Sequence, residues 1–490
     1  MKGCEAVRAA PEDMPGIARA LHAAGGRLQM VYAWQPEPGQ TELCYVGYPQ
    51  GGGKFLMWRC RPRADAPSLA AIWPALGWYE REIMDLFGLV FSRHPEPNRL
   101  VLAPGVPPPF AAAGRDAGQR AADVPRPLPE LVASGVQVLP FGPVRADVTE
   151  SAEFTFFYTG EQILHYHPHL FFKHRGMEAR FHGVAPAAAV VLAERVSGIG
   201  SVAHALAFCH AVEAAAGCTP PPRALALRVL LAEMERLVSH LHYFGHLAAT
   251  TTLKVGEAEG KLLEERAKQI LGRLSGSRFG RGLLTPGGLR RDLPATGWLG
   301  PALAALEEET TRYLARLERS ASYLDRLIGT GMLSREVALD QGATGPVQRA
   351  SGIDRDLRRD HPYAAYATLP LEVAGATDGD AAARARVRAA EIAASFALLR
   401  HLLGALPPGP VRTTCAPEPG TEGLGWAESP RGTLFHAVHL GADGRLSRVK
   451  IKSPSFSNWR VFPFTVHETN MMDYAINEAS FGLGVAGCAR

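Results

Sequence analysis

The chain has 490 residues, 47% of them hydrophobic, and this length and composition can fill the cores of roughly two to four domains. A disordered chain and a small disulfide-stabilised domain are therefore excluded. The formal net charge is only +4, and no basic run alternates with aromatic residues, which argues against a nucleic-acid-binding protein. The seven cysteines include no C-x-x-C pair, so no single segment predicts a zinc site or an iron–sulfur cluster.

Neither a membrane span nor export is predicted. The longest apolar run, APAAAVVLA at 185–193, contains a proline and is about half of the roughly 18–20 residues needed to cross a bilayer. The first residues, MKGCEAVRAAPEDM, lack the apolar region of a secretory signal. We therefore expect a cytoplasmic protein that reaches a membrane only through partner subunits.

The first hundred residues predict a small α+β domain, which we place at residues 1–105. Apolar and aromatic stretches at 28–34, 42–49 and 54–60 are separated by glycine and proline, a pattern typical of strands. The following stretch, 106–135, is rich in proline and alanine. Such a composition predicts an extended linker that runs along the surface.

Residues 136–490 predict a larger, mostly α-helical domain with peripheral β-hairpins, so the fold class is α+β. The alternating FTFFY followed by Thr159-Gly160 predicts a strand and a hairpin turn. Alternation returns after Gly432 and predicts a second hairpin, followed by a polar-aromatic loop and a last helix. Apolar residues at three- and four-residue spacing predict mutually packed helices in five segments, which are 185–215, 223–248, 256–274, 300–330 and 380–404.

The segment GWYEREIMDLFGLVFSRHPEPNRLVL, at 77–102, is rich in charge and ends in a turn. On composition alone it predicts a solvated helix face. The order of E-R-E, D-x-F-G and H-P, however, resembles the 30 kDa subunit of respiratory complex I and its fused counterpart in membrane-bound hydrogenases. This resemblance implies that the segment is a docking element and not a catalytic one.

Four later blocks resemble the 49 kDa subunit of complex I and the large subunit of the energy-converting (group 4) [NiFe] hydrogenases. They occur in the family order, so the resemblance extends over most of the chain and implies a fused 30 kDa/49 kDa-type subunit. The blocks are PHLFFKHRGMEARF (168–181), ERVSGIGSVAHALAF (194–208), GPVQRASGIDRDLRRDHPY (345–363) and SPSFSNW (453–459).

The hydrogenases of this family hold nickel with two C-x-x-C pairs, because soft thiolates are the ligands that this metal requires. The resemblance places Ser197 and Gly200 at the first pair and Gly484 and Gly487 at the second. Cys488 lies one place away, and a single thiolate would still form no cluster. We therefore expect this chain to bind no metal and to lack nickel-dependent hydrogenase activity.

The resemblance also assigns a quinone headgroup to two histidines of one loop and to a tyrosine. Here the loop 142–151 carries Arg145 and Thr149 in place of the histidines, and Gly198 stands at the tyrosine position. Threonine can donate a hydrogen bond but cannot deliver a proton near neutral pH as histidine can. An NADH–quinone oxidoreductase subunit with altered quinone contacts is therefore one alternative, with quinone as a candidate ligand.

Many ionisable residues of the family's cavity are retained. For each of them, an ion pair that holds loops together is the alternative to a functional role, and His174 with Glu178 and Asp356 with Arg358 are spaced to pair. The functional role would be a proton path or a place for a partner's cluster to dock. Candidate proton-relay or cavity residues are Glu161, His169, His174, Arg175, Glu178, Glu194, Arg195 and His204, and candidates that face a cluster or a quinone are Arg145, Thr149, Arg349, Asp356 and Arg358.

The resemblance implies a peripheral subunit at the cytoplasmic face of the cell membrane. It would pass electrons from a partner's iron–sulfur cluster toward a quinone-like or unknown acceptor, while partner subunits translocate ions. The implied partners are a small iron–sulfur subunit, a ferredoxin-like subunit and integral membrane antiporter-like subunits. A non-catalytic structural subunit that keeps only the docking surfaces is the second alternative. It would differ from the first in binding neither quinone nor any other oxidant.

Overall fold

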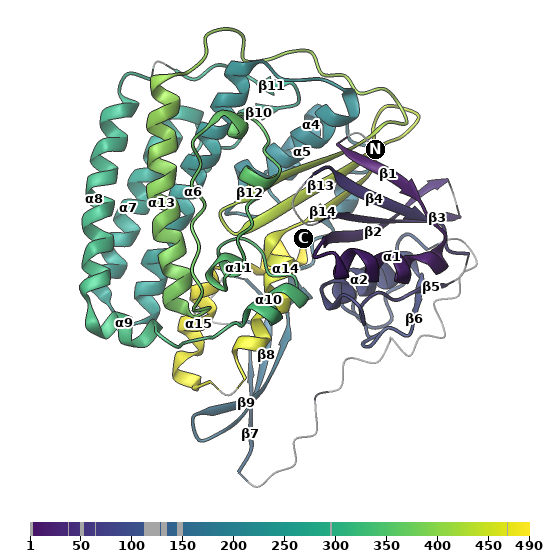
Figure 1. Ribbon diagram of the computed structural model, residues 1–490, viewed down its shortest axis with the longest axis horizontal. Coiled ribbons are helices and arrows are strands. Elements are labelled where there is room, and N and C mark those ends of the chain that lie inside the picture. The colour runs from purple at the N-terminus through teal and green to yellow at the C-terminus, as the bar shows by residue number, and fades with distance from the viewer. Residues whose placement is uncertain are drawn as a thin grey trace.

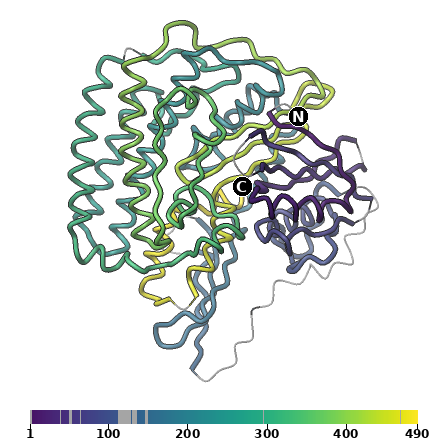
Figure 2. Tube along the Cα trace, viewed as in Figure 1, coloured from purple at the N-terminus to yellow at the C-terminus, as the bar shows by residue number. Residues whose placement is uncertain are grey.

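The computed structural model describes residues 3–37, 39–49, 53–63, 65–111, 128, 135–144, 150–294, 296–467 and 469–490. A small N-terminal unit lies on one side of the molecule and a bundle of long helices on the other, with a three-stranded sheet between them (Figure 1). The last segment of the chain returns to the junction between the two units (Figure 2). Most of the predicted linker lies outside the described residues. No described helix combines the length and hydrophobicity of a bilayer span.

The N-terminal unit is a four-stranded sheet with the order β1-β4-β3-β2, in which β1 runs parallel to β4 and the other pairs are antiparallel. The three predicted strands are confirmed as β2, β3 and β4. Helix α2 packs against β2. The elements are β1 (Cys4–Arg8), α1 (Met14–Ala23), β2 (Arg27–Glu37), β3 (Gln40–Tyr48), β4 (Phe55–Cys60), β5 (Asp65–Pro67), α2 (Gly77–Phe87) and β6 (Val90–Ser92).

Helix α2 is buried, so the interpretation of its charges as a solvated face is wrong. Glu80, Arg81, Glu82 and Asp85 are all buried. The Asp85 carboxylate accepts three consecutive backbone N–H groups of the segment 100–102, and Arg81 donates to two carbonyl oxygens just before it. These bonds satisfy the buried charges and fix the turn that follows the helix.

The second unit contains the five predicted helical segments, which are confirmed, with breaks at 194–200 and at 320. Its helices are α3 (Met177–Arg180), α4 (Pro186–Ala193), α5 (Ser201–Ala216), α6 (Pro222–Thr250), α7 (Lys254–Ser275), α8 (Leu299–Arg319), α9 (Ala321–Leu327), α10 (Arg335–Asp340), α11 (Pro346–Ala350), α12 (Leu357–Asp360), α13 (Ala381–Gly404), α14 (Pro454–Val461), α15 (Tyr474–Phe481) and α16 (Val485–Ala489).

Two antiparallel three-stranded sheets and a short pair complete this unit. Thr159-Gly160 forms the predicted turn between two strands of the first sheet, and the predicted C-terminal hairpin gains a third strand and lies in the interior. The strands are β7 (Gln137–Phe141), β8 (Glu153–Thr159) and β9 (Gln162–His169), then β10 (Leu284–Thr285) and β11 (Gly288–Leu289), and finally β12 (Glu422–Ser429), β13 (Gly432–Leu440) and β14 (Leu446–Lys452).

The expected polar-aromatic loop after the C-terminal hairpin is instead helix α14. Its N-cap is Ser453, whose hydroxyl accepts the backbone N–H of Phe456 at 3.2 Å, and Pro454 occupies the first helical position. Serine at the N-cap and proline at the first position are the preferred residues at a helix start. The loop expectation was therefore wrong because this local capping signal was overlooked.

Helix α5 lies directly on the central sheet. A Cβ atom at Gly423 or Gly425 of β12 would lie only 2.0 and 2.2 Å from the carbonyl oxygens of Ala211 and Ala207. Only glycine permits this approach of helix backbone to strand backbone. The contact fixes the N-terminus of α5, where the candidate site begins.

Candidate functional site

The loop between α4 and α5 is held by two buried carboxylates. Gly200, the N-cap of α5, has a φ of 110°, a conformation that favours glycine. The Glu235 carboxylate, on α6, accepts the backbone N–H groups of Val202 and Ala203 at 2.7 and 2.9 Å. Glu194 accepts the backbone N–H of Gly282 at 2.6 Å. The loop thus has a single backbone course, set by α6 and by the turn before β10.

The C-terminal helix α16 meets this loop. A Cβ atom built on Gly487 would lie 3.5 Å from the Ser197 hydroxyl oxygen and 3.5 Å from that of Ser455. Two of the four positions assigned to nickel thiolates therefore lie side by side. A Cβ atom on Gly200 would instead approach the His204 ring at 3.7 Å, and one on Gly484 would meet the Arg431 guanidinium.

Arg175 and His174 join the loop to α16. The Arg175 guanidinium donates to the carbonyl oxygens of Val196 and Ala486, at 2.5 and 3.1 Å. The His174 Nδ1 lies 2.7 Å from the carbonyl oxygen of Ala489. Both residues therefore position the backbone of the site.

Glu178 lies in a buried cluster of cations and not beside His174. Its carboxylate lies 2.7 Å from Arg448, 3.1 Å from Lys450 and 3.4 Å from Arg490. Burial alone would raise the pKa of this carboxyl group, but the three cations hold it well below its usual value. The pairing of His174 with Glu178 considered above is wrong, because α3 begins at Met177 and leaves His174 in extended backbone.

A second charge cluster contains Arg349, Asp356 and Arg358, all three completely buried. Arg349 lies 3.2 Å from Asp356, 3.3 Å from Glu428 and in closer contact with Glu391. Arg358 pairs with Asp356 at 2.8 Å, as its spacing allowed, and with Glu233 at 3.2 Å. The interior of the helical unit is thus organised around paired charges. In the described part of the chain, no three His, Cys, Asp or Glu side chains converge in a way that could hold a metal.

The remaining candidates lie apart from Ser197 and Gly487. Glu161 is exposed at the turn between β8 and β9, and His169 is exposed at the end of β9. The Arg195 side chain is half-exposed beside Glu194 at 3.7 Å. His204 is buried, and its Nδ1 lies 3.1 Å from the Nε2 of His436. Burial keeps the pKa of both rings below the usual value, so this pair is neutral.

Arg145 and Thr149 lie outside the described residues, so their assignment to a quinone stays a prediction.

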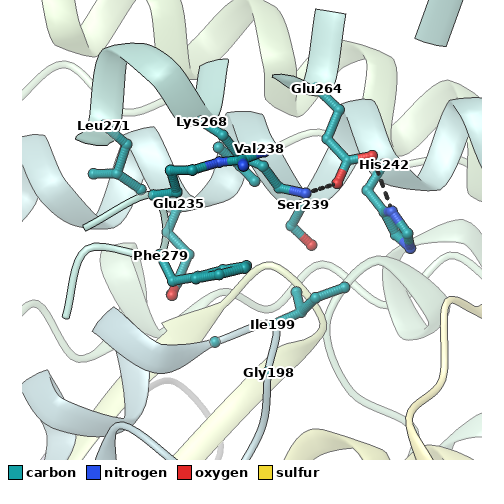
Figure 3. Close-up of a pocket in the computed structure, with 12 residues that line it drawn as sticks. Gly198, Ile199, Glu235, Val238, Ser239, His242, Glu264, Lys268, Leu271 and Phe279 are labelled. Atoms are coloured by element: carbon teal, nitrogen blue, oxygen red, sulfur yellow. Dashed lines mark hydrogen bonds and ion pairs between the residues drawn. The ribbon is translucent and has the colours of Figure 1, made fainter. Parts of the chain in front are cut away.

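A cavity of about 120 Å³ opens on the other side of the loop. Its wall contains Gly198, Ile199 and Gly200 of the loop, together with Glu235 and Phe279. Figure 3 shows Lys268, Glu264 and His242 in a row along one side, where Glu264 accepts from Lys268 and lies 3.1 Å from His242. The cavity therefore combines an apolar body with a few polar groups, as small-molecule sites do.

Glu235 predicts a pH-dependent stability. Burial raises the pKa of its carboxyl group to about 7. Above its ordinary pKa of about 4.3 the unfolded state has lost a proton that the folded state keeps, so the free energy of unfolding should fall as pH rises to 7, by roughly 3 kcal/mol in total. The variant E235Q should lose this contribution. Urea unfolding of both proteins at about pH 5 and about pH 8 measures the difference.

The matched control is E308Q, which makes the same change at an exposed position of α8. It should leave the pH dependence unchanged. An E235Q variant whose stability followed pH as steeply as the wild type would contradict the assignment of this titration to Glu235.

Comparison with known proteins gives matches along most of the chain. The profile of "Respiratory-chain NADH dehydrogenase, 30 Kd subunit" matches residues 7–112, that of "Nickel-dependent hydrogenase" matches 175–275, and that of "Respiratory-chain NADH dehydrogenase, 49 Kd subunit" matches 262–419. Formate hydrogenlyase subunit 5 of Escherichia coli (strain K12) is 31% identical over 423 residues, which cover 84% of this chain and 74% of that protein. The fused C/D polypeptide of NADH-quinone oxidoreductase from Cereibacter sphaeroides (strain ATCC 17029 / ATH 2.4.9) is 30% identical, with coverage of 85% and 80%.

The chain belongs to the family of fused 30 kDa/49 kDa-type subunits of complex I-like and hydrogenase-related membrane complexes. A solved structure shares its fold, with a TM-score of 0.69 and 25% identity over 73% of this chain and 99% of the other. That protein belongs to the membrane-bound sulfane sulfur reductase, described as an archaeal respiratory membrane complex.

The residues at this family's metal positions do not fit a nickel centre. Ser197 and Gly487 meet where two thiolates would be required, and the Arg431 guanidinium faces Gly484. A cationic guanidinium cannot replace a thiolate, because it has no lone pair to donate to a metal. Cys488 is completely buried, and burial raises the pKa of its thiol well above the usual value. We therefore derive no chemistry through nickel for this member of the family.

Sequence reasoning missed Glu233, Glu235, Arg236 and His240, although one signal was present. These charged residues interrupt the apolar face of a predicted helix, and Glu233, Arg236 and His240 recur at three- and four-residue spacing. In the structure these three meet the buried charges of α13, while Glu235 faces the start of α5. Helix α6 thereby connects the charge cluster to the loop. Arg431 and Glu391 gave no comparable local signal.

Proposed function

We propose that this chain is a redox subunit of a membrane-associated oxidoreductase complex and that it works without nickel. It would receive electrons from an iron–sulfur cluster of a partner subunit and pass them toward a quinone-like or other small acceptor, while membrane subunits translocate ions. The chain itself would bind peripherally to those subunits. The names of its relatives, which include quinone oxidoreductase and formate hydrogenlyase subunits, support this proposal.

One observation carries the proposal. The contact of Gly487 with Ser197 preserves the meeting of loop and C-terminal helix, although no thiolate remains there. Arg175 still joins both segments through three carbonyl oxygens, and Glu235 still fixes the start of α5. The frame around the reaction site is thus built completely, which a chain kept only as a scaffold would not require.

The residues of this chain would contribute electrostatics and protons. Arg175 and Arg431 place positive charge next to the loop, which favours the arrival of electrons. Glu235 has a pKa of about 7 and can exchange a proton near neutral pH. The likeness to a chain of a sulfane sulfur reductase complex makes sulfur compounds an acceptor class to assay beside quinones.

Purification of the tagged chain from native membranes in mild detergent tests the proposal. We expect an iron–sulfur subunit and polytopic membrane subunits in a fixed ratio by mass spectrometry. Iron should be present in amounts expected for clusters, and nickel should be at background by elemental analysis. Recovery of the chain alone and without iron would contradict the proposal, since it would have no electron source. Nickel in a one-to-one ratio would contradict the proposed chemistry.

A further inference from the structure

Gly484 precedes α16 and faces the Arg431 side chain. A Cβ atom at this position would lie 2.4 Å from Nη1 of Arg431 and 3.4 Å from its Cζ. The backbone does not demand glycine here, because φ is −136°, an extended value open to every residue. The absence of a side chain at 484 therefore makes room for the guanidinium and has no other structural purpose.

The Arg431 guanidinium has no hydrogen-bond or ion-pair partner among the described residues. Arg349 and Arg358, in the neighbouring cluster, each pair with two or more carboxylates. Burial lowers the pKa of Arg431 to about 10, so the side chain is charged at neutral pH. A desolvated cation whose five N–H donors find no acceptor in the described chain is costly unless something else accepts them.

Ser455 supplies a second donor beside the first. Its hydroxyl oxygen would lie 3.5 Å from a Cβ atom on Gly487, and it too has no hydrogen bond within the described chain. Gly484 is the N-cap of α16 and Gly487 its third residue, and side chains at these two positions meet in capped helices. Arg431 and Ser455 therefore flank one space. Ser197 closes its wall, since its hydroxyl already donates to the carbonyl oxygen of Ile199 at 2.8 Å.

We propose that Arg431 and Ser455 form a binding site for a small monovalent anion, in the space that the absent side chains of Gly484 and Gly487 leave. The inference rests on the proposed function insofar as it identifies the chemical class of the acceptor or of a co-ligand at that site.

The local charges favour an anion with a single charge. Arg175 and Arg431 bring two positive charges to this end of α16, and Glu150 brings one negative charge. The backbone N–H groups of Val485 and Ala486 are already donated to the Glu150 carboxylate, so the helix start offers no further donors there. One positive charge thus remains uncompensated. The site is small, so a bulky oxidant is excluded.

Thiocyanate is a suitable probe, because its infrared stretching band reports the hydrogen bonds that the bound ion receives. In the purified complex we expect saturable binding, which nitrate should displace and divalent sulfate should not. The variant R431Q should raise the dissociation constant about 10- to 100-fold, since it removes charge-assisted hydrogen bonds. G484A should weaken binding similarly, because the added methyl group displaces the flexible end of Arg431 without straining the backbone.

The matched control is G300A on α8, where an added Cβ atom meets nothing within 4 Å. It should bind thiocyanate as the wild type does. Equal binding by wild type, R431Q and G484A, or no binding by a complex that retains its clusters, would overturn the anion site and leave the proposed function intact. Anion binding that depends on Arg431 in a chain that purifies without any iron–sulfur partner would support the site and overturn the proposed function.

Discussion

The variant Arg349→Met should lose about 3–5 kcal/mol of unfolding free energy at neutral pH, one of the two largest effects that the structure predicts. Methionine keeps much of the side-chain volume, so the change removes charge and leaves little cavity. It leaves Asp356, Glu391 and Glu428 in the interior without their shared guanidinium. Urea unfolding followed by circular dichroism measures the loss.

This loss should depend on pH in a defined direction. In the folded protein Arg349 and Arg358 lower the pKa of Asp356 to about 2 despite its burial, and Arg349 holds that of Glu391 well below its usual range. Such groups stabilise the fold above their ordinary pKa of about 4, and the contribution disappears as pH falls toward the folded value. In the variant these carboxyl groups protonate at higher pH, so its deficit should be largest near pH 7 and smaller near pH 4.

The control is Arg316→Met, which removes an exposed arginine that pairs with Glu259 on the surface. Its effect should stay within about 0.5 kcal/mol at both pH values. A comparable loss in R316M and R349M would show that the buried pairing is not what the interior depends on.

Replacement of Glu82 by glutamine should cost about 3–5 kcal/mol and should loosen the contact between the two units. Glu82 lies on α2 of the N-terminal unit and contacts Lys450 at 2.6 Å and Arg490 at 2.7 Å in the second unit. With Glu82 neutral, Glu178 alone would face Arg448, Lys450 and Arg490. Hydrogen exchange should then accelerate in both α2 and β14, because each loses a charged partner across the interface.

A second substitution tests the same cause. The double variant E82Q/K450M should recover part of the lost stability, since it removes one of the unpaired cations. E96Q, at an exposed position 3.5 Å from Arg81, should change little. A double variant less stable than E82Q by the full cost of K450M alone would show that the two residues act independently.

Much of the fold could be predicted because its signals are local. Three strands and five helical segments follow from alternation and from three- and four-residue spacing, and the order of motifs led to the family. The charge of α2 misled composition-based reasoning, because the cations and backbone groups that bury it come from residues up to 408 positions away. Spacing also failed for His174 and Glu178, since an i, i+4 pair forms only where both residues are helical.

The site could be predicted only as far as the resemblance extended. It placed Ser197 and Gly487 at equivalent ligand positions, and the structure brings these two together. Arg431 has no such signal, because the reason for its position is the missing side chain of Gly484, 53 residues later. Glu391 likewise acquires meaning only when α13 packs on α6 and brings it 2.7 Å from His240.

The glycine contact of α5 with β12 has a consequence for electron transfer. Gly423 and Gly425 bring strand and helix backbones together, so α5 can neither rotate nor slide without a collision of main-chain atoms. The loop at its N-terminus and the dipoles around it are therefore held still. Polar groups that do not move when a charge arrives keep the reorganisation energy low. A partner's cluster docked against this loop would meet surroundings already oriented for the electron it delivers.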